Sequence, residues 1–262
     1  MPMFIRSAAY SRASCLKYTD AREMGVEVKL YVQNGVDWRF HEVFEANHID
    51  LEKDVLVFHE DPPGLGNNVW SQLGKKTRSY YHFSLAKYQR IVCFDVDIWF
   101  LNPINLFAQL ASLPPDMIAY PETNPRDVSL IMNRIGLYTS QNGLALDTIF
   151  ERAGIRDLPE TLQKPVGYFW THPAAPLLMD MAHYDFISWI SDHSPYIGDD
   201  ENIMALASHK FGYPLHSLKT QTGIRFTGVR DVITGKNDNA HIAHGKAPYN
   251  QDAEFNAFLS GL

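Results

Sequence analysis

Two carboxylates, Asp95 and Asp97, stand inside one of the most apolar stretches of the chain, "RIVCFDVDIWFLNP" at residues 90–103. Burying one unpaired charge is costly, and two like charges raise each other's pKa unless a cation compensates. Carboxylate oxygens prefer hard ions such as Mg²⁺ and Mn²⁺, which often share their coordination shell with substrate phosphates. The pair therefore predicts a site for Mn²⁺ or Mg²⁺ that also holds a diphosphate.

The neighbouring segments predict where this pair lies. Residues 71–88 have the length and spacing of a helix, and the short apolar run after them indicates a strand buried on both faces. Asp95 and Asp97 then follow the end of an interior strand on one face, with Val96 turned inward, because residues two apart in a strand share a face. Ligands bind at such strand ends in open α/β sheets. The structural alternative is that the carboxylates cap loops or pair with a neighbour such as Arg90.

Strands and helices alternate along the rest of the chain. We predict strands at residues 3–8, 26–33, 54–60, 116–122 and 240–250, a polar loop at 124–127, and helices at residues 11–24, 104–113, 175–193 and 200–212. Gly25 and Gly212 are the expected helix stops. This alternation predicts one α/β domain over residues 1–262, with a mostly parallel central sheet.

The composition excludes several classes of protein. An apolar fraction of 45% and a charged fraction of 20% are typical of a folded globule, and the net charge of −7 gives no general attraction to nucleic acid or membranes. Cys15 and Cys93 lack metal-binding or redox spacing and are expected to be free thiols. Without a signal-peptide pattern or a long apolar run, the chain is expected to be soluble and cytoplasmic.

The segment "FSLAKYQRIVCFDVDIWFLNPINLF" at residues 83–107 resembles the core of family-8-type glycosyltransferases of the GT-A fold, the group of glycogenin and bacterial galactosyltransferases. In that family an SL-x-x-Y helix end, an apolar strand, D-x-D, an apolar quartet and x-I-x-x-LF follow in this order. The resemblance implies a Rossmann-like three-layer sandwich. It also implies a hexosyltransferase-type enzyme that moves a sugar from a nucleotide diphosphate, expected to be a UDP-sugar, to a hydroxyl acceptor with retention, using metal bound by Asp95 and Asp97.

A second segment, "GDDENIMAL" at residues 198–206, is similar to the family's D-Q-x-x-(x)-N segment. The acidic residue of that segment lies near the donor sugar and its reacting carbon. The resemblance therefore makes Asp199 and Asp200 the catalytic candidates, with the choice between them open. Asn202 is the corresponding candidate for donor binding.

A third segment, "HIAHGKAPYN" at residues 241–250, resembles the family's H-x-x-G-x-x-K-P-W. There the histidine completes the metal shell and the lysine holds the diphosphate. Aligned on the final Pro-aromatic pair, the family's histidine falls on His241, which is the preferred third ligand, while His244 takes the glycine position and competes with it. Lys246 stands one place before the family's lysine and is the candidate for the diphosphate. For either histidine, a purely structural role is the alternative.

Further donor contacts are expected from residues near the same crevice. Arg78, with Lys75 and Lys76 as alternatives, precedes the acidic strand where the family carries a basic residue, although a solvated basic face is the plainer interpretation. The loop after the predicted first strand offers polar and aromatic groups to the base and phosphates: Tyr10 and Arg12, with Arg6 and Ser7.

Two alternatives to a transferase come from different classes. "VCFDVD" followed by "GDDEN" also resembles haloacid-dehalogenase-like phosphatases, in which the first Asp of D-x-D-x-T is the nucleophile and the second a general acid. Trp99 stands at the position of that threonine and speaks against this interpretation. The other alternative is a non-catalytic sugar-nucleotide-binding homologue, favoured by the altered His/Lys segment. The sequence leaves the sugar, the acceptor and the oligomeric state open.

Overall fold

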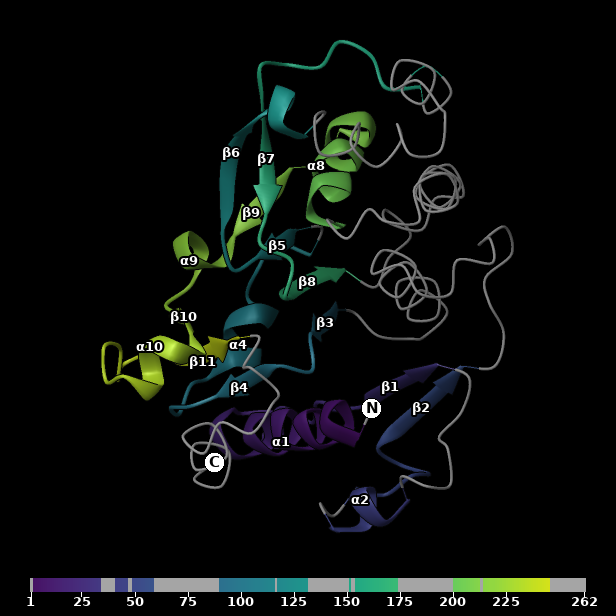
Figure 1. The fold of residues 1–262 in the computed structure, drawn as a ribbon, viewed down its shortest axis with the longest axis vertical. Helices are drawn as coiled ribbons and strands as arrows, with labels where there is room; N and C mark the ends of the chain where they lie inside the picture. The colour runs from purple at the N-terminus through teal and green to yellow at the C-terminus, as the bar shows by residue number, and fades with distance from the viewer. Residues whose placement is uncertain are drawn as a thin grey trace. The chain divides into compact units, whose positions relative to one another are not determined.

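The computed structural model describes residues 2–33, 41–46, 49–58, 90–115, 117–131, 151, 154–173, 200–212 and 214–245 (Figure 1). The chain forms two compact units. Unit 1 comprises Met1–Glu60, Cys93–Leu113 and Leu218–Leu262, and unit 2 comprises Asp61–Val92 and Pro114–Ser217. That the whole chain acts as one catalytic domain stays a prediction.

Unit 1 begins with a helix rather than a strand. Helix α1 (Pro2–Tyr18) includes residues 3–8, so the strand predicted there is wrong. A short apolar run does not by itself distinguish a strand from a buried helix segment. The helix predicted at residues 11–24 begins earlier, with Ser7 and Ser11 four residues apart and both buried. It ends at Tyr18, so the expected stop at Gly25 is wrong.

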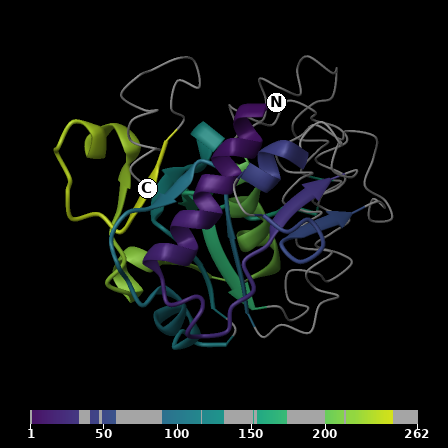
Figure 2. The ribbon, with the colours of Figure 1, turned by 90° about the horizontal axis from the view of Figure 1, so that it is seen from below.

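A small parallel strand pair follows α1. Strand β1 (Leu30–Gln33) pairs with β2 (Val55–Phe58), and helix α2 (His41–Ala46) lies between them in the chain. Figure 2 shows the two strands side by side. The predicted third strand is confirmed by β2. The predicted second strand is confirmed only in its later half, because the backbone from Gly25, where φ is +63°, to Lys29 is irregular.

The second sheet of unit 1 has three described strands, in the order β10 (Phe226–Gly228), β11 (Ile242–His244) and β4 (Ile98–Phe100). β11 runs parallel to β10 and antiparallel to β4. The late strand predicted at residues 240–250 is thus confirmed over its described part, and this sheet brings the C-terminal segment against the residues after the acidic pair.

Three short helices accompany this sheet: α4 (Leu106–Ala111), α9 (Leu218–Gln221) and α10 (Val229–Ile233). α4 confirms the core of the helix predicted at residues 104–113. Trp99, Val229 and Ala243 form a buried cluster between α10 and the two strands that carry Trp99 and Ala243. The cluster connects the start of α10 to β4, which follows the acidic pair, and to β11, which pairs with β4.

The main sheet of unit 2 has the strand order β3 (Arg90–Phe94), β8 (Phe169–Pro173), β5 (Ile118–Tyr120) and β9 (Leu215–Ser217). β5 pairs antiparallel with β8 and parallel with β9. The predicted strands at β3 and β5 are confirmed. Among the described strands, however, β3 is the outermost of its sheet, and only Ile91 of its five residues is buried. The interior position expected for this strand is not found in the described part of the chain.

A hairpin and a helix complete the described part of unit 2. β6 (Thr123–Asp127) pairs antiparallel with β7 (Thr161–Pro165), and helix α8 (Asp200–Phe211) packs against β7. The polar loop predicted at residues 124–127 is wrong, because these residues belong to a strand and pair with β7. The sequence pattern did not indicate this strand, because its residues are exposed and show no alternation of apolar and polar side chains. α8 is confirmed, and Gly212 ends it with φ at +70°. The helices predicted at residues 71–88 and 175–193 lie outside the described residues.

The described strands therefore combine parallel and antiparallel pairs with helices, which confirms the α/β class. None of the described helices has both the length and the apolar character needed to cross a membrane.

The short helix α4 receives its N-terminal cap from a distant residue. Its adjacent Asn105 makes no side-chain cap, whereas the buried carboxylate of Asp20 accepts hydrogen bonds from the N–H groups of Phe107 at 2.8 Å and Ala108 at 2.9 Å. These are two of the N–H groups that a helix leaves without intrahelical partners.

We expect Asp20→Ala to lower the free energy of unfolding by about 1–3 kcal/mol, because it removes both charge-assisted bonds at a buried position. Urea unfolding followed by circular dichroism measures the loss. Asp20→Asn keeps one acceptor oxygen and should lose less. Equal stability of Asp20→Ala and the parent would show that α4 needs no cap from Asp20.

Candidate metal centre

Asp95 and Asp97 lie in the short turn between β3 and β4. β3 ends at Phe94, and Val96 and Asp97 form a turn before β4 begins at Ile98. Asp97 is 7% exposed and Asp95 is half-buried, whereas the side chain of Val96 faces solvent and is 38% exposed. The prediction that Val96 turns inward is wrong, because strand alternation does not continue through a turn.

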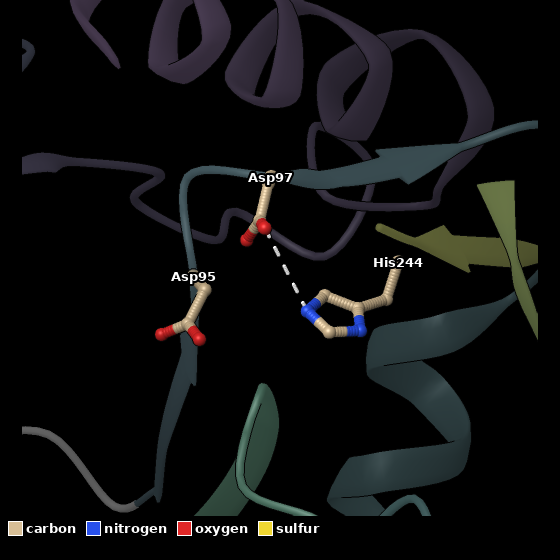
Figure 3. A group of neighbouring side chains, drawn as sticks. All are labelled: Asp95, Asp97 and His244. Carbon is tan, nitrogen blue, oxygen red and sulfur yellow. Dashed lines mark ion pairs between the residues drawn. The ribbon is translucent and has the colours of Figure 1, made fainter. Parts of the chain in front are cut away.

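His244 meets this turn from the neighbouring strand. β11 runs antiparallel to β4 with His244 opposite Ile98, which is the residue after Asp97. The Nε2 atom of His244 lies 3.7 Å from Oδ2 of Asp97, and one ligand atom from each of Asp95, Asp97 and His244 lies within 4.8 Å of the others. Figure 3 shows the side chains of Asp95 and Asp97 on one turn and that of His244 on the neighbouring strand, around one space.

The distance between Asp97 and His244 is compatible with a shared small divalent cation. For an octahedral ion bound at about 2.1 Å, neighbouring ligand atoms are about 3.0 Å apart and opposite ones about 4.2 Å. The 3.7 Å between Asp97 and His244 falls between these values. Two carboxylates with one imidazole form a donor set for Mn²⁺ or Mg²⁺ and leave further coordination positions for water or phosphate oxygens. Asp95, Asp97 and His244 together can therefore hold a divalent cation.

A glycine allows the end of β11 to approach the acidic turn. The N–H of Gly245 donates a hydrogen bond to the carbonyl oxygen of Asp97 at 3.4 Å. A Cβ atom on Gly245 would lie 2.2 Å from Cγ1 of the buried Val229, which is closer than such atoms approach. Gly245 stands one place after the family's glycine position, which His244 occupies. Its position directly after His244 was the available signal for the correct histidine.

His241, the preferred third ligand of the sequence analysis, lies elsewhere. Its carbonyl oxygen accepts a hydrogen bond at 2.9 Å from the N–H of Leu101, which follows β4. Because β4 and β11 are antiparallel, the three residues from His244 back to His241 lead about 10 Å away from the acidic turn. The competing candidate, His244, is the histidine that the structure brings to Asp95 and Asp97.

The ring of His241 contacts Arg225 instead. Its Nδ1 atom accepts a hydrogen bond from the backbone N–H of Arg225 at 3.2 Å, and Nε2 lies 3.1 Å from the guanidinium Nη2. Burial, and secondly the charge of Arg225, lower the pKa of His241. A protonated ring would present N–H groups and positive charge to the donors of Arg225.

The lowered pKa gives a pH dependence with a definite sign. Below the unfolded-state pKa of about 6.5, the unfolded chain binds a proton that the folded ring resists, so stability falls as the pH decreases through this value. His241→Gln should flatten this dependence in urea unfolding midpoints measured from pH 5 to pH 8. Parallel curves for the variant and the parent would contradict the assignment.

Arg12 and Tyr10 make contacts within unit 1. Arg12 Nη2 forms an ion pair with Asp54 at 2.5 Å, and its Nε donates to the carbonyl oxygen of Val28 at 3.0 Å. These contacts join α1 to the segments beside β1 and β2. Tyr10 packs against the cluster that contains Trp99. Both residues lie on α1 and not on the loop expected for them, and their donor-binding roles stay predictions.

The remaining predicted site residues are not described by their side chains. Arg78, Asp199 and Lys246 lie outside the described residues. Asp200 and Asn202 belong to the first turn of α8, where the structure describes the backbone of these two residues and not their side chains. Their assigned roles remain predictions.

Glu201, which the sequence analysis passed over, anchors that turn of α8. Its carboxylate accepts a hydrogen bond from the N–H of Gly167 at 2.7 Å and forms an ion pair with Lys164. Lys164 lies on β7, and Gly167 lies in the turn between β7 and β8. Glu201 thus attaches the start of α8, where Asp200 and Asn202 lie, to the adjacent strands.

The fold of this chain has a counterpart among solved structures. No family model matches the chain, and no curated protein matches it. Among solved structures, it is similar to mouse xyloside xylosyltransferase 1 in its apo form, with a TM-score of 0.51 and 14% sequence identity over 96% of this chain and 95% of that chain. At this identity the similarity shows the fold alone, which is the α/β fold of GT-A-type glycosyltransferases. The narrower resemblance to family 8 stays a prediction.

The two histidines provide a direct test of the metal centre. His244→Ala should weaken Mn²⁺ binding by more than about 10-fold, because it removes a direct ligand and the loss of a group that only orients a ligand already costs about 10- to 100-fold. His241→Ala, a change of the same type at the other end of β11, should leave the affinity unchanged. Isothermal titration with MnCl₂ measures both. A loss caused by His241→Ala and not by His244→Ala would contradict the geometry.

Proposed function

We propose that this chain is a metal-dependent glycosyltransferase that moves a sugar from a nucleotide diphosphate, specifically a UDP-sugar, to a hydroxyl acceptor. The observation that supports it most is the convergence of Asp95, Asp97 and His244 on one space in a chain with the GT-A-type fold. The structural neighbour is named as a xylosyltransferase, which supports sugar transfer. Hexosyl transfer and retention of configuration are proposed from the family-8 resemblance.

In this proposal Asp95, Asp97 and His244 hold Mn²⁺ or Mg²⁺. A cation held by these three residues would supply positive charge to the departing diphosphate, whose negative charge is larger in the transition state than in the bound donor. The buried position of Asp97 keeps its carboxylate away from bulk water, which strengthens its attraction to a cation.

Other residues are proposed to bind and orient the donor. Lys246 and Arg78 supply positive charge to the diphosphate. Asp199 or Asp200 orients the hydroxyls of the donor sugar or stabilises positive charge at its reacting carbon, and Asn202 binds the same sugar. These roles rest on the family resemblance and apply to side chains that the structure does not describe.

The structure gives a reason to prefer transfer over phosphatase chemistry. The phosphatase signature needs a small hydroxyl at position 99, whereas Trp99 is fully buried against Val229 and Ala243. Its indole ring is part of the buried cluster with Val229 and Ala243 and cannot replace that hydroxyl. A non-catalytic sugar-nucleotide-binding protein would use the same metal centre, and turnover distinguishes it from an enzyme.

The test is release of UDP from UDP-glucose, UDP-galactose and UDP-xylose in the presence of Mn²⁺. We expect one donor to be hydrolysed slowly without acceptor. Asp97→Asn should reduce this rate by about 100-fold at nearly constant volume, because it removes a charged ligand. The matched control Asp238→Asn changes an exposed aspartate in unit 1 and should keep the parental rate.

Three outcomes would replace the proposal with another. Turnover of an aryl phosphate would indicate the phosphatase. Stabilisation by UDP with Mn²⁺ in a thermal shift, without release from any donor, would indicate a binding protein. A parental rate in Asp97→Asn would exclude the acidic turn as the site of donor cleavage.

A further inference from the structure

Three buried serines occupy one side of α1. Ser7, Ser11 and Ser14 are 4%, 1% and 1% exposed, and their spacing of four and three residues places them on one face of the helix. α1 packs against β4, as Figure 1 shows. Among the described strands, β4 pairs with β11 along one edge. The serine face of α1 lies along the opposite edge of β4.

Two of these hydroxyl groups bond the backbone at the two ends of β4. Ser7 Oγ donates a hydrogen bond to the carbonyl oxygen of Val96 at 2.7 Å. At the other end, the N–H of Phe100 donates to Ser14 Oγ at 3.1 Å. Ser7 and Ser14 are seven residues apart, which is about 10.5 Å along a helix, and the three residues between the Val96 carbonyl and the Phe100 N–H would span about 10 Å if extended. The helix and the strand therefore match in length, and each serine serves one end of β4.

The partner of Ser7 is the peptide between the two candidate ligands. The carbonyl of Val96 belongs to the peptide group that joins it to Asp97, so the hydrogen bond restrains the backbone on the N-terminal side of Asp97. On the C-terminal side, Gly245 N–H donates to the carbonyl oxygen of Asp97 at 3.4 Å. Both peptide groups that flank the Cα atom of Asp97 are thus hydrogen-bonded to other segments. The Asp97 carboxylate emerges from this restrained backbone toward His244.

Restraint of this turn opposes the electrostatic repulsion between Asp95 and Asp97. Without a cation, the like charges of Asp95 and Asp97 repel each other, and a free turn would relax by moving them apart. A backbone that keeps them together avoids part of the reorganisation that metal binding otherwise requires. The same hydrogen bond leaves the side chain of Val96 facing solvent, where it is 38% exposed.

We propose that Ser7 is a positioning residue for the metal centre: its hydroxyl holds the Val96 carbonyl so that Asp95 and Asp97 converge with His244. The inference rests on the proposed metal-dependent function and adds to it a residue that touches neither the cation nor the donor. It also replaces the nucleotide contact expected for Ser7 from its sequence position.

The experiment measures Mn²⁺ affinity of the full chain without nucleotide, by the electron paramagnetic resonance signal of free Mn²⁺ during titration. Ser7→Ala should bind Mn²⁺ about tenfold more weakly, as is usual when a group that orients a ligand is lost. Ser7→Thr keeps a hydroxyl and should restore most of the affinity.

Ser14→Ala is the matched control, because it removes a buried hydroxyl from the same helix face at the far end of β4. Ser14→Ala should lower the melting temperature and leave Mn²⁺ affinity unchanged. If Ser7 had only a structural role, Ser7→Ala and Ser14→Ala would affect Mn²⁺ affinity equally. If Ser7→Ala fails to fold, Ser7→Cys replaces the hydroxyl by a weak donor of similar size and should show the same loss.

The possible outcomes distinguish failure of the positioning role of Ser7 from failure of the proposed metal centre. Parental Mn²⁺ binding in folded Ser7→Ala or Ser7→Cys, or an equal loss in Ser14→Ala, would overturn the positioning role while the metal centre stands. No Mn²⁺ binding by the parent would overturn the metal centre itself and the inference with it.

Discussion

Repulsion between the carboxylates of Asp95 and Asp97 is the constraint on which the site depends. The two groups are close in a turn where one is buried and the other half-buried, and water screens such charges poorly there. A positive partner is therefore needed on the same side of the turn. His244 provides a nitrogen at 3.7 Å from Asp97, and the same three groups have the geometry to share a divalent cation. The arrangement is thus more consistent with a binding centre than with loop capping.

Long-range contacts determine the shape of this centre. α1 holds the turn through Ser7, β11 presents His244, and Gly245 permits the close passage of the chain beside Val229. These segments are far apart in the sequence but belong to one compact unit. The site therefore belongs to unit 1 as a folded body, and mutations distant in sequence are expected to act on metal affinity as well as on stability.

Local sequence patterns identified several elements and misassigned others. β3 and the helix α8 with its Gly212 stop follow from apolar clustering and glycine conformation, which are local properties. The start of α1 and the strand β6 do not. On the face that α1 buries, the hydroxyl groups of Ser7 and Ser14 bond the turn before β4 and the end of β4. β6 forms because β7 pairs with its exposed residues. In both cases a tertiary partner decided between two locally permitted conformations.

From the residue types around Asp95 and Asp97, the sequence predicted a candidate cation centre after an apolar strand, because like charges need neutralisation wherever the chain places them. It could not determine the third ligand. His241 and His244 are both compatible with the local pattern, and the register of β11 against β4 places His244 at the acidic turn and His241 beside Leu101. That register depends on pairing between segments about 140 residues apart in the chain, so it can be known only from the folded structure.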